Sequence, residues 1–184
     1  PLRLVGSEMC IRDRSIAIPD SVTKIENITF TGCSSLTSIS IPESVTYIGL
    51  DAFKDCTSLT SIYIPDSVTL TGLSGTFSGC TSLTNVKLPD VIYIISTNTF
   101  AGCSSLLNII IPDSVTSIKE CAFEGCKSLT NIAIPESVTK IKTWAFKDCT
   151  SLKSIAINNP DCEISNAKDT IPETAVIYGY KNST

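Results

Sequence analysis

Residues 35–56 read SLTSISIPESVTYIGLDAFKDC, and most of the chain repeats this phrase with small changes. Four residue types recur in register, and successive prolines lie 23, 23, 24, 23 and 23 residues apart. The four columns are Pro19, Pro42, Pro65, Pro89, Pro112 and Pro135; Phe30, Phe53, Phe77, Phe100, Phe123 and Phe146; Cys33, Cys56, Cys80, Cys103, Cys126 and Cys149; and Leu36, Leu59, Leu83, Leu106, Leu129 and Leu152. A fixed period in this range is typical of a solenoid, in which each copy forms one coil stacked on the last. We therefore predict a mainly β repeat solenoid of about six 23-residue coils over residues 15–160.

Each copy contains the pattern of one short strand followed by a turn. Ile39 and Ile41 alternate with serines, which predicts a strand with one buried face. Pro42 ends that strand because proline has no N–H, and the acid or the serine after it is able to hold backbone N–H groups in a turn. Residues 45–48 predict a second, shorter extended segment, and residues 52–56 predict a single 3₁₀ or α turn.

The ends of the chain and its third coil depart from the repeat. Residues 1–14 do not follow it, and LVGSEMCIRDR resembles a translated sequencing-adapter remnant, so we interpret this segment as a sequence artefact or, alternatively, as an N-terminal cap. It has no apolar core of the length that a signal peptide needs. Residues 161–184 are expected to form a C-terminal cap and tail, with a last strand at residues 175–178. The segment LTGLSGT, residues 70–76, lies where the third coil is one residue longer and predicts a bulge on the back of the solenoid.

Composition excludes several classes of function. The chain of 184 residues carries a net charge of −4 and no run of basic residues, which argues against nucleic acid as a partner. No apolar run approaches the ~18 residues of a membrane-spanning helix. The chain has no histidine, so it has neither a Ser-His-Asp nor a Cys-His arrangement, and we predict no enzymatic activity and no cofactor.

The cysteine column is a candidate metal or disulfide site. Ligands 23 residues apart and stacked coil over coil do not converge as a tetrahedral metal site requires. Disulfides between neighbouring coils remain geometrically feasible, because coils about 4.8 Å apart match the spacing of bridged cysteines. Parallel side chains that all point into one core favour a column of buried thiols instead. Cys121 and Cys162 lie outside the column, and a bridge that involves either of them stays an alternative.

A second column consists of one acid directly after each proline. Its members are Asp20, Glu43, Asp66, Asp90, Asp113 and Glu136. Calcium requires several carboxylates that converge on one point, whereas one acid per coil gives a line. Turn formation and solubility therefore explain this column better, and we predict no metal site.

The repeated phrase resembles a known family of repeats. The pattern L-x-x-I-x-I-P-x-S-V-T-x-I-x-x-x-A-F-x-x-C, clearest at residues 36–56, 106–126 and 129–149, is similar to the BspA-type leucine-rich repeat over residues 15–160. This resemblance implies a right-handed coil with a parallel sheet on the concave side and irregular structure or short 3₁₀ turns on the convex side. It also implies a secreted or cell-surface protein with a role in adhesion or binding, and it offers no catalytic residues.

The concave face holds the residues that the fold leaves free. Most of them are small and polar, but Tyr63, Lys87, Leu107 and Ile110 differ and come from three adjacent coils. With two neighbouring asparagines they form a candidate partner-binding surface about 10–15 Å across. Its members are Tyr63, Asn85, Lys87, Leu107, Asn108 and Ile110. The alternative is that Leu107 and Ile110 are isolated apolar residues on the surface, with no role in binding.

Two functions are favoured by this sequence, and an enzyme with paired carboxylates is a third, disfavoured hypothesis. The first is a non-enzymatic module that binds an extracellular protein or glycan through the concave sheet. The second is a structural spacer within a longer surface array. On the opposite side, Trp144 is expected to be partly exposed and to pack over lysine side chains.

Overall fold

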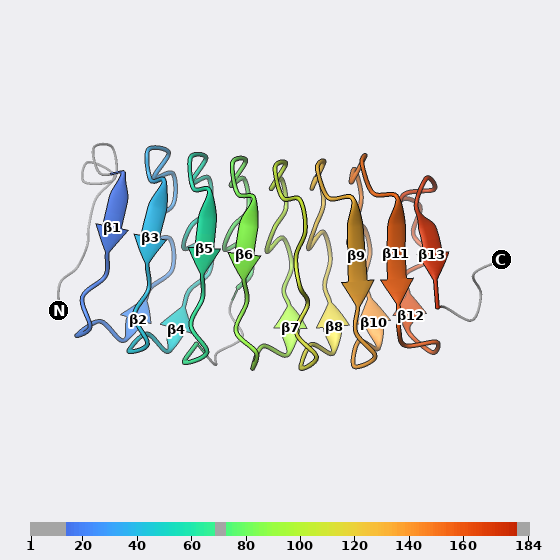
Figure 1. Ribbon diagram of the computed structural model, residues 1–184, viewed down its shortest axis with the longest axis horizontal. Coiled ribbons are helices and arrows are strands. Elements are labelled where there is room, and N and C mark those ends of the chain that lie inside the picture. Colours follow the sequence, from blue (N-terminus) through green and yellow to red (C-terminus); the bar gives the residue numbers. More distant parts are fainter. Residues whose placement is uncertain (1–13, 69–72, 180–184) are drawn as a thin grey trace.

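The computed structural model describes residues 14–68 and 73–179 as a stack of about seven coils (Figure 1). Thirteen short strands and the turns between them make up this part of the chain, and no helix occurs in it. Every pair of hydrogen-bonded strands is parallel. The predicted mainly β solenoid is therefore confirmed.

One side of the stack is a row of three- and four-residue strands, which we call the front sheet (Figure 1). Its strands are β1 (Ser15–Ala17), β3 (Ser38–Ser40), β5 (Ser61–Tyr63), β6 (Asn85–Lys87), β9 (Asn131–Ile134), β11 (Ser154–Ile157) and β13 (Val176–Tyr178). Their central residue is mostly buried and its neighbours exposed, as the alternation around Ile39 predicts. The last strand lies where the sequence predicts a closing strand.

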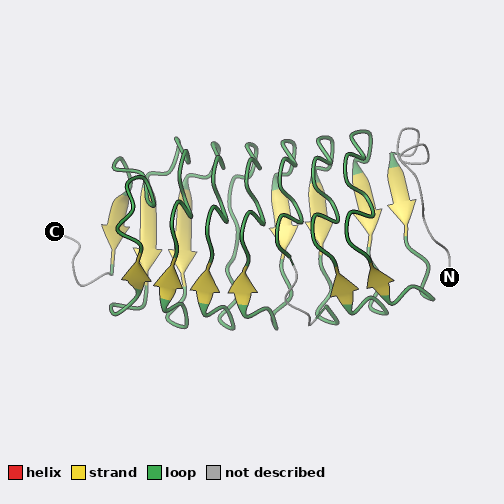
Figure 2. Ribbon diagram, turned by 180° about the vertical axis from the view of Figure 1, so that it is seen from behind, coloured by secondary structure: helices red, strands yellow, loops and turns green. Residues whose placement is uncertain are grey.

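The opposite side, which we call the back, carries a second row of two-residue strands (Figure 2). These strands are β2 (Lys24–Ile25), β4 (Tyr47–Ile48), β7 (Ile94–Ile95), β8 (Ser117–Ile118), β10 (Lys140–Ile141) and β12 (Glu163–Ile164). They correspond to the second extended segment expected after each proline. The strands β7, β8, β10 and β12 form one continuous ladder.

The register between coils follows the repeat length. Ile39 pairs with Ile16, a step of 23 residues, whereas Asn85 pairs with Ser61, a step of 24. The extra residue lies between Val68 and Leu73, and most of that stretch falls outside the described residues, as does much of the predicted bulge.

The segment around each phenylalanine consists of successive i→i+3 turns, which are the short irregular turns expected on this side, and none of them extends into a helix. Ala52 donates its N–H to the Gly49 carbonyl at 3.3 Å, and Cys56 donates to the Phe53 carbonyl at 3.2 Å. The third residue of each turn has a positive φ, 53° at Asp51 and 57° at Asp55, which is the type II geometry. A left-handed residue every fourth position prevents the chain from continuing as a helix.

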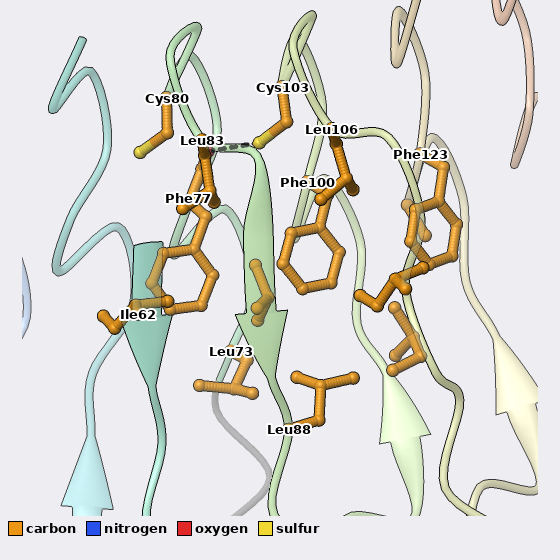
Figure 3. Packing of buried hydrophobic residues seen from close by; sticks show 14 of the residues in the cluster. Ile62, Leu73, Phe77, Cys80, Leu83, Leu88, Phe100, Cys103, Leu106 and Phe123 are labelled. Carbon is orange, nitrogen blue, oxygen red and sulfur yellow. Dashed lines mark hydrogen bonds between the residues drawn. The ribbon is translucent and has the colours of Figure 1, made fainter. Parts of the chain in front are cut away.

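Stacked phenylalanine rings run through the core from Phe30 to Phe146, and Figure 3 shows Phe77, Phe100 and Phe123 among them. Neighbouring rings from Phe30 to Phe146 lie 5.2–5.7 Å apart between centroids, with interplanar angles of 3–14°. Offset stacking at this distance adds about 0.5–1.5 kcal/mol per pair to the burial of the rings. Each coil is therefore stabilised by the coils on both sides of it.

The cysteine column is a ladder of buried thiols over five of its six positions. Each thiol donates a hydrogen bond to the phenylalanine carbonyl of the coil before it, as Cys103 does to Phe77 at 3.1 Å (Figure 3). The five thiols are Cys56, Cys80, Cys103, Cys126 and Cys149, with sulfur–oxygen distances of 3.0–3.3 Å. Cys33 departs from the expected column because it is disulfide-bonded. Cys121 and Cys162 are free thiols, so neither forms the bridge left open by the sequence.

In the turn after the proline, the serines bond differently from one of the two expected arrangements. Ser44 and Ser67 donate their hydroxyls to the carbonyls of Val22 (2.8 Å) and Val45 (2.7 Å) in the preceding coil, so these serines do not hold N–H groups. The valine carbonyl lies within reach because it is the same turn one coil earlier. The acid does accept an N–H in one coil, where Asp66 receives the N–H of Asp90 at 2.8 Å.

Candidate binding surface

All six residues of the predicted binding surface lie on the front of three consecutive coils and are exposed. We call this set the front patch. Tyr63 on β5 pairs with Lys87 on β6, and Asn85 lies on the same strand as Lys87. Leu107, Asn108 and Ile110 belong to the next coil. The exposed fraction is 84% for Ile110, 54% for Leu107 and 49% for Tyr63.

The front row is divided into three sheets, β1–β3, β5–β6 and β9–β11–β13, and the coil that carries Leu107 and Ile110 lies in the second gap (Figure 1). Other coils are joined by bonds such as the one from the Thr60 N–H to the Thr37 carbonyl at 3.2 Å. Within the described ranges, no backbone hydrogen bond joins Leu107 to Thr84 or Thr130 to Leu107. The back of this coil remains paired, because β8 bonds to both β7 and β10. This coil is therefore paired with its neighbours on the back but not at residues 107–111 of the front, where Ile110 lies exposed.

A column of threonine hydroxyls ends at the same coil. Thr37, Thr60 and Thr84 each donate a hydroxyl to the carbonyl one coil earlier, at 2.6, 3.3 and 3.0 Å. Leu107 occupies the next position and has no hydroxyl to donate. A polar position that stabilises the stack in three coils thus presents an apolar side chain to solvent in this one.

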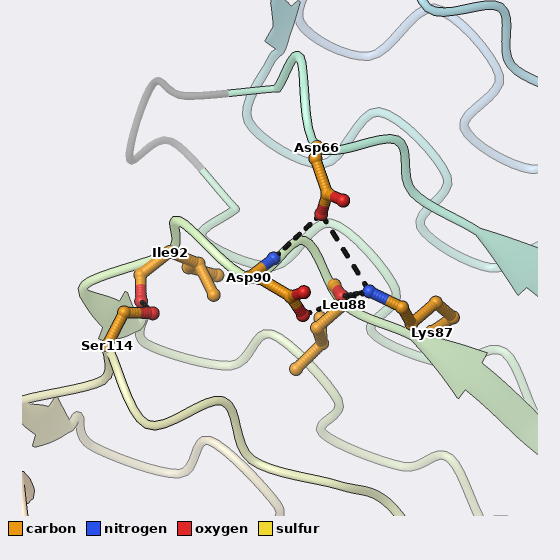
Figure 4. A network of polar contacts seen from close by, with 6 residues as sticks. All are labelled: Asp66, Lys87, Leu88, Asp90, Ile92 and Ser114. Atoms are coloured by element: carbon orange, nitrogen blue, oxygen red, sulfur yellow. Dashed lines mark hydrogen bonds and ion pairs between the residues drawn. The ribbon is translucent and has the colours of Figure 1, made fainter.

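Lys87 is held by carboxylates within the chain (Figure 4). Its Nζ lies 3.0 Å from Asp90 Oδ1 and 3.8 Å from Asp66 Oδ1, and it donates a hydrogen bond to the Leu88 carbonyl at 2.9 Å. The hydrogen bond with Asp90 raises the pKa of Lys87. This ammonium therefore points away from the other members of the front patch, toward the turn that follows the strand.

The column of acids after the prolines forms one exposed edge of the stack, below the front sheet in Figure 1, and we call it the acidic rim. The rim consists of Asp20, Glu43, Asp66, Asp90, Asp113 and Glu136, all exposed. No group of three or more potential metal-ligating side chains is close enough to hold a metal ion anywhere in residues 14–68 and 73–179. This same part of the chain contains no helix with the length and hydropathy needed to cross a membrane.

Several exposed apolar residues lie elsewhere, and sequence reasoning did not single out all of them. Trp144 is 44% exposed and has the Lys147 Nζ 4.8 Å from its ring centroid, as expected. Val91 and Tyr93, 37% and 56% exposed, were not predicted as surface features. The signal for them was Asp-Val-Ile-Tyr after Pro89 in place of the usual Asp-Ser-Val-Thr.

Comparisons with known proteins place this geometry in a family. The model of the BspA type leucine rich repeat region matches residues 8–90 and 73–168, with six copies. The structure is similar to a leucine rich repeat protein of T. pallidum, with a TM-score of 0.73 and 29% identity over 77% of this chain and 68% of that one. A leucine-rich repeat protein of Bacteroides ovatus has a TM-score of 0.72 and 30% identity over 89% of this chain and 47% of that one.

A leucine rich cell surface protein of Faecalibacterium prausnitzii is also similar, with a TM-score of 0.53 and 26% identity over 88% of this chain and 62% of that one. The chain thus spans less than half the length of the Bacteroides ovatus protein. No curated protein matches the sequence significantly. On the match of the repeat model over most of its length, the chain belongs to the BspA-type leucine rich repeat family.

Proposed function

We propose that this chain is a non-enzymatic binding module that uses the front patch to hold an extracellular protein or glycan. The observation that carries the proposal is the position of Ile110, 84% exposed, in the coil whose front segment is not hydrogen-bonded to its neighbours. Large apolar side chains gathered on a surface often mark an interaction site. Burying Ile110 against a partner is worth about 1.5–3 kcal/mol.

The location of the protein at the cell surface, or its secretion, is part of the same proposal. The similar Faecalibacterium prausnitzii protein is described as a cell surface protein, which supports this location. The uninterrupted stack of phenylalanine rings gives the module a continuous core, so the front patch lies on a rigid scaffold.

The same continuous core favours a second candidate, a spacer within a longer array. A spacer requires stiffness along the stack and no particular surface, whereas a binding module depends on the identity of the exposed side chains. Substitutions on the front that leave the core intact therefore separate the two functions.

The test is a pull-down from host extracellular matrix and surface glycans with the whole chain and with the double variant Tyr63→Ser/Ile110→Asp. Tyr93→Ser is the matched control, because Tyr93 is as exposed as Tyr63 and lies outside the front patch. A binding module loses its partner in the double variant and keeps it in the control. Capture that survives in both variants contradicts the front patch as the site, and no capture by the unsubstituted chain favours the spacer.

A further inference from the structure

The ion pairs of Lys87 show how a cation on the front sheet is recognised by the acidic rim (Figure 4). The side chain leaves β6, passes the Leu88 carbonyl and places its ammonium between the carboxylate of its own coil, Asp90, and that of the preceding coil, Asp66. One strand position therefore gives access to two consecutive rim carboxylates.

The next two coils repeat the same strand, turn and rim acid, but neither has a lysine or arginine at the position of Lys87. Ile110 and Ala133 follow Lys87 in the repeat, and Asp113 and Glu136 follow Asp90. Neither the Asp113 nor the Glu136 carboxylate makes a hydrogen bond or ion pair within the described part of the chain. Ala133 and both carboxylates are exposed, and the alanine carries no group that could pair with either acid.

We propose, on the basis of the binding function above, that the partner is a protein segment with a lysine or arginine beside an apolar side chain. The cation lies over Ala133 between Asp113 and Glu136, and the apolar side chain covers Ile110. Both contacts fall within reach of one segment because neighbouring coils are about 4.8 Å apart.

Charge complementarity favours this partner over an acidic one. The six rim carboxylates form a row of like charges, and Lys87 compensates only Asp90 and Asp66. The whole chain carries a net charge of −4, which attracts a basic segment before contact. Arginine forms two parallel hydrogen bonds with a carboxylate, so a guanidinium suits this position well.

The probes are three short synthetic peptides labelled with a fluorophore. The first alternates lysine with leucine, the second replaces each lysine with glutamate, and the third replaces each leucine with serine. Binding to the full chain is measured by fluorescence anisotropy at two salt concentrations. We expect saturable binding of the lysine–leucine peptide only, weakened by salt. No saturable binding of that peptide up to about 1 mM overturns the proposal.

The decisive variant is Ala133→Lys, which supplies an internal cation in the arrangement that Lys87 shows. It should weaken binding of the lysine–leucine peptide by about five-fold or more. Ser40→Lys is the matched control, because it makes the same charge change on β3 beside Glu43 and Asp20, away from Ile110. Equal losses in both variants mean that the peptide responds to net charge alone, and the proposal fails.

A second variant, Asp113→Asn/Glu136→Gln, tests the same carboxylates without adding a side chain, and circular dichroism checks that each variant is folded. Its control is Asp55→Asn/Asp148→Asn, two exposed acids on the opposite edge of the stack. If Ile110→Asp abolishes capture of the matrix partner while the rim variants do not, the front patch stands as the binding site and the basic partner is refuted. If Ile110→Asp changes neither the capture of the matrix partner nor the binding of the peptide, the proposed binding function of the front patch is itself refuted.

Discussion

Replacement of Phe100 by alanine tests how much the stacked phenylalanine column stabilises the fold, at a ring that has a stacked neighbour on both sides. The ring is fully buried and stacks on Phe77 at 5.6 Å and on Phe123 at 5.4 Å. Its burial is worth about 1.5–3 kcal/mol, and two stacked pairs add about 0.5–1.5 kcal/mol each. The sum agrees with the loss of about 3–5 kcal/mol that is usual when a buried phenylalanine is replaced by alanine.

The assay is equilibrium unfolding in urea followed by circular dichroism. The matched control is Phe30→Ala, because among the described residues the Phe30 ring stacks only on Phe53. We expect a smaller loss of unfolding free energy for Phe30→Ala than for Phe100→Ala, by about the value of one stacked pair, ~0.5–1.5 kcal/mol. A loss below about 1 kcal/mol for Phe100→Ala would refute the stacked column as the source of stability.

Three other predictions follow from the backbone and the thiols. Ile28 has a φ of 63° and is 59% exposed, so Ile28→Asn should raise the unfolding free energy by about 1 kcal/mol in the same urea assay; a loss would refute the strain. Burial raises the pKa of Cys103 from 9.0 to about 12, so the folded chain holds that proton more tightly than the unfolded chain. The contribution of the buried Cys103 thiol to the free energy of unfolding should therefore be fully present below pH 9.0 and fall as the pH rises toward about 12. A urea midpoint that stays constant over this pH range would contradict the buried thiol. Amide hydrogens of residues 107–111 should exchange faster than those of β9, and equal protection would show that this coil is hydrogen-bonded to its neighbours on the front.

The periodic core was readable from the sequence because every coil repeats the same buried positions. Ile39, Phe53 and Cys56 could be placed inside from their spacing alone, and all three are buried. The register and the parallel pairing follow from the same period, because equivalent residues of consecutive coils lie side by side.

The left-handed position before each phenylalanine could not be read in three of the six coils, because isoleucine, cysteine and tryptophan disfavour that conformation, whereas Asp51, Gly75 and Asn98 suit it. Ile28, Cys121 and Trp144 all have a φ between 54° and 63°, where glycine or asparagine would be expected. The hydrogen bonds of the stack, such as the one from the Phe30 N–H to the Ala52 carbonyl at 2.8 Å, impose it in spite of the side chain. A backbone conformation that hydrogen bonds from neighbouring coils impose cannot be predicted from the residue types of one coil.

The surface was predicted in outline only. Alternation placed Tyr63, Leu107 and Ile110 on one face, where the structure has them. The ion pairs that turn Lys87 toward Asp90 depend on the reach of a flexible side chain, and the interruption of the sheet depends on hydrogen bonds between coils. Neither is visible in the spacing of residue types.

The affinity of the captured partner for the whole chain and for Ile110→Asp tests most directly whether the front patch is the binding surface. Biolayer interferometry with the partner immobilised gives both dissociation constants, with Tyr93→Ser as the control. The burial of Ile110 predicts a loss of more than about ten-fold in Ile110→Asp and none in the control. Equal affinity of the unsubstituted chain and Ile110→Asp would place the binding surface elsewhere on the solenoid.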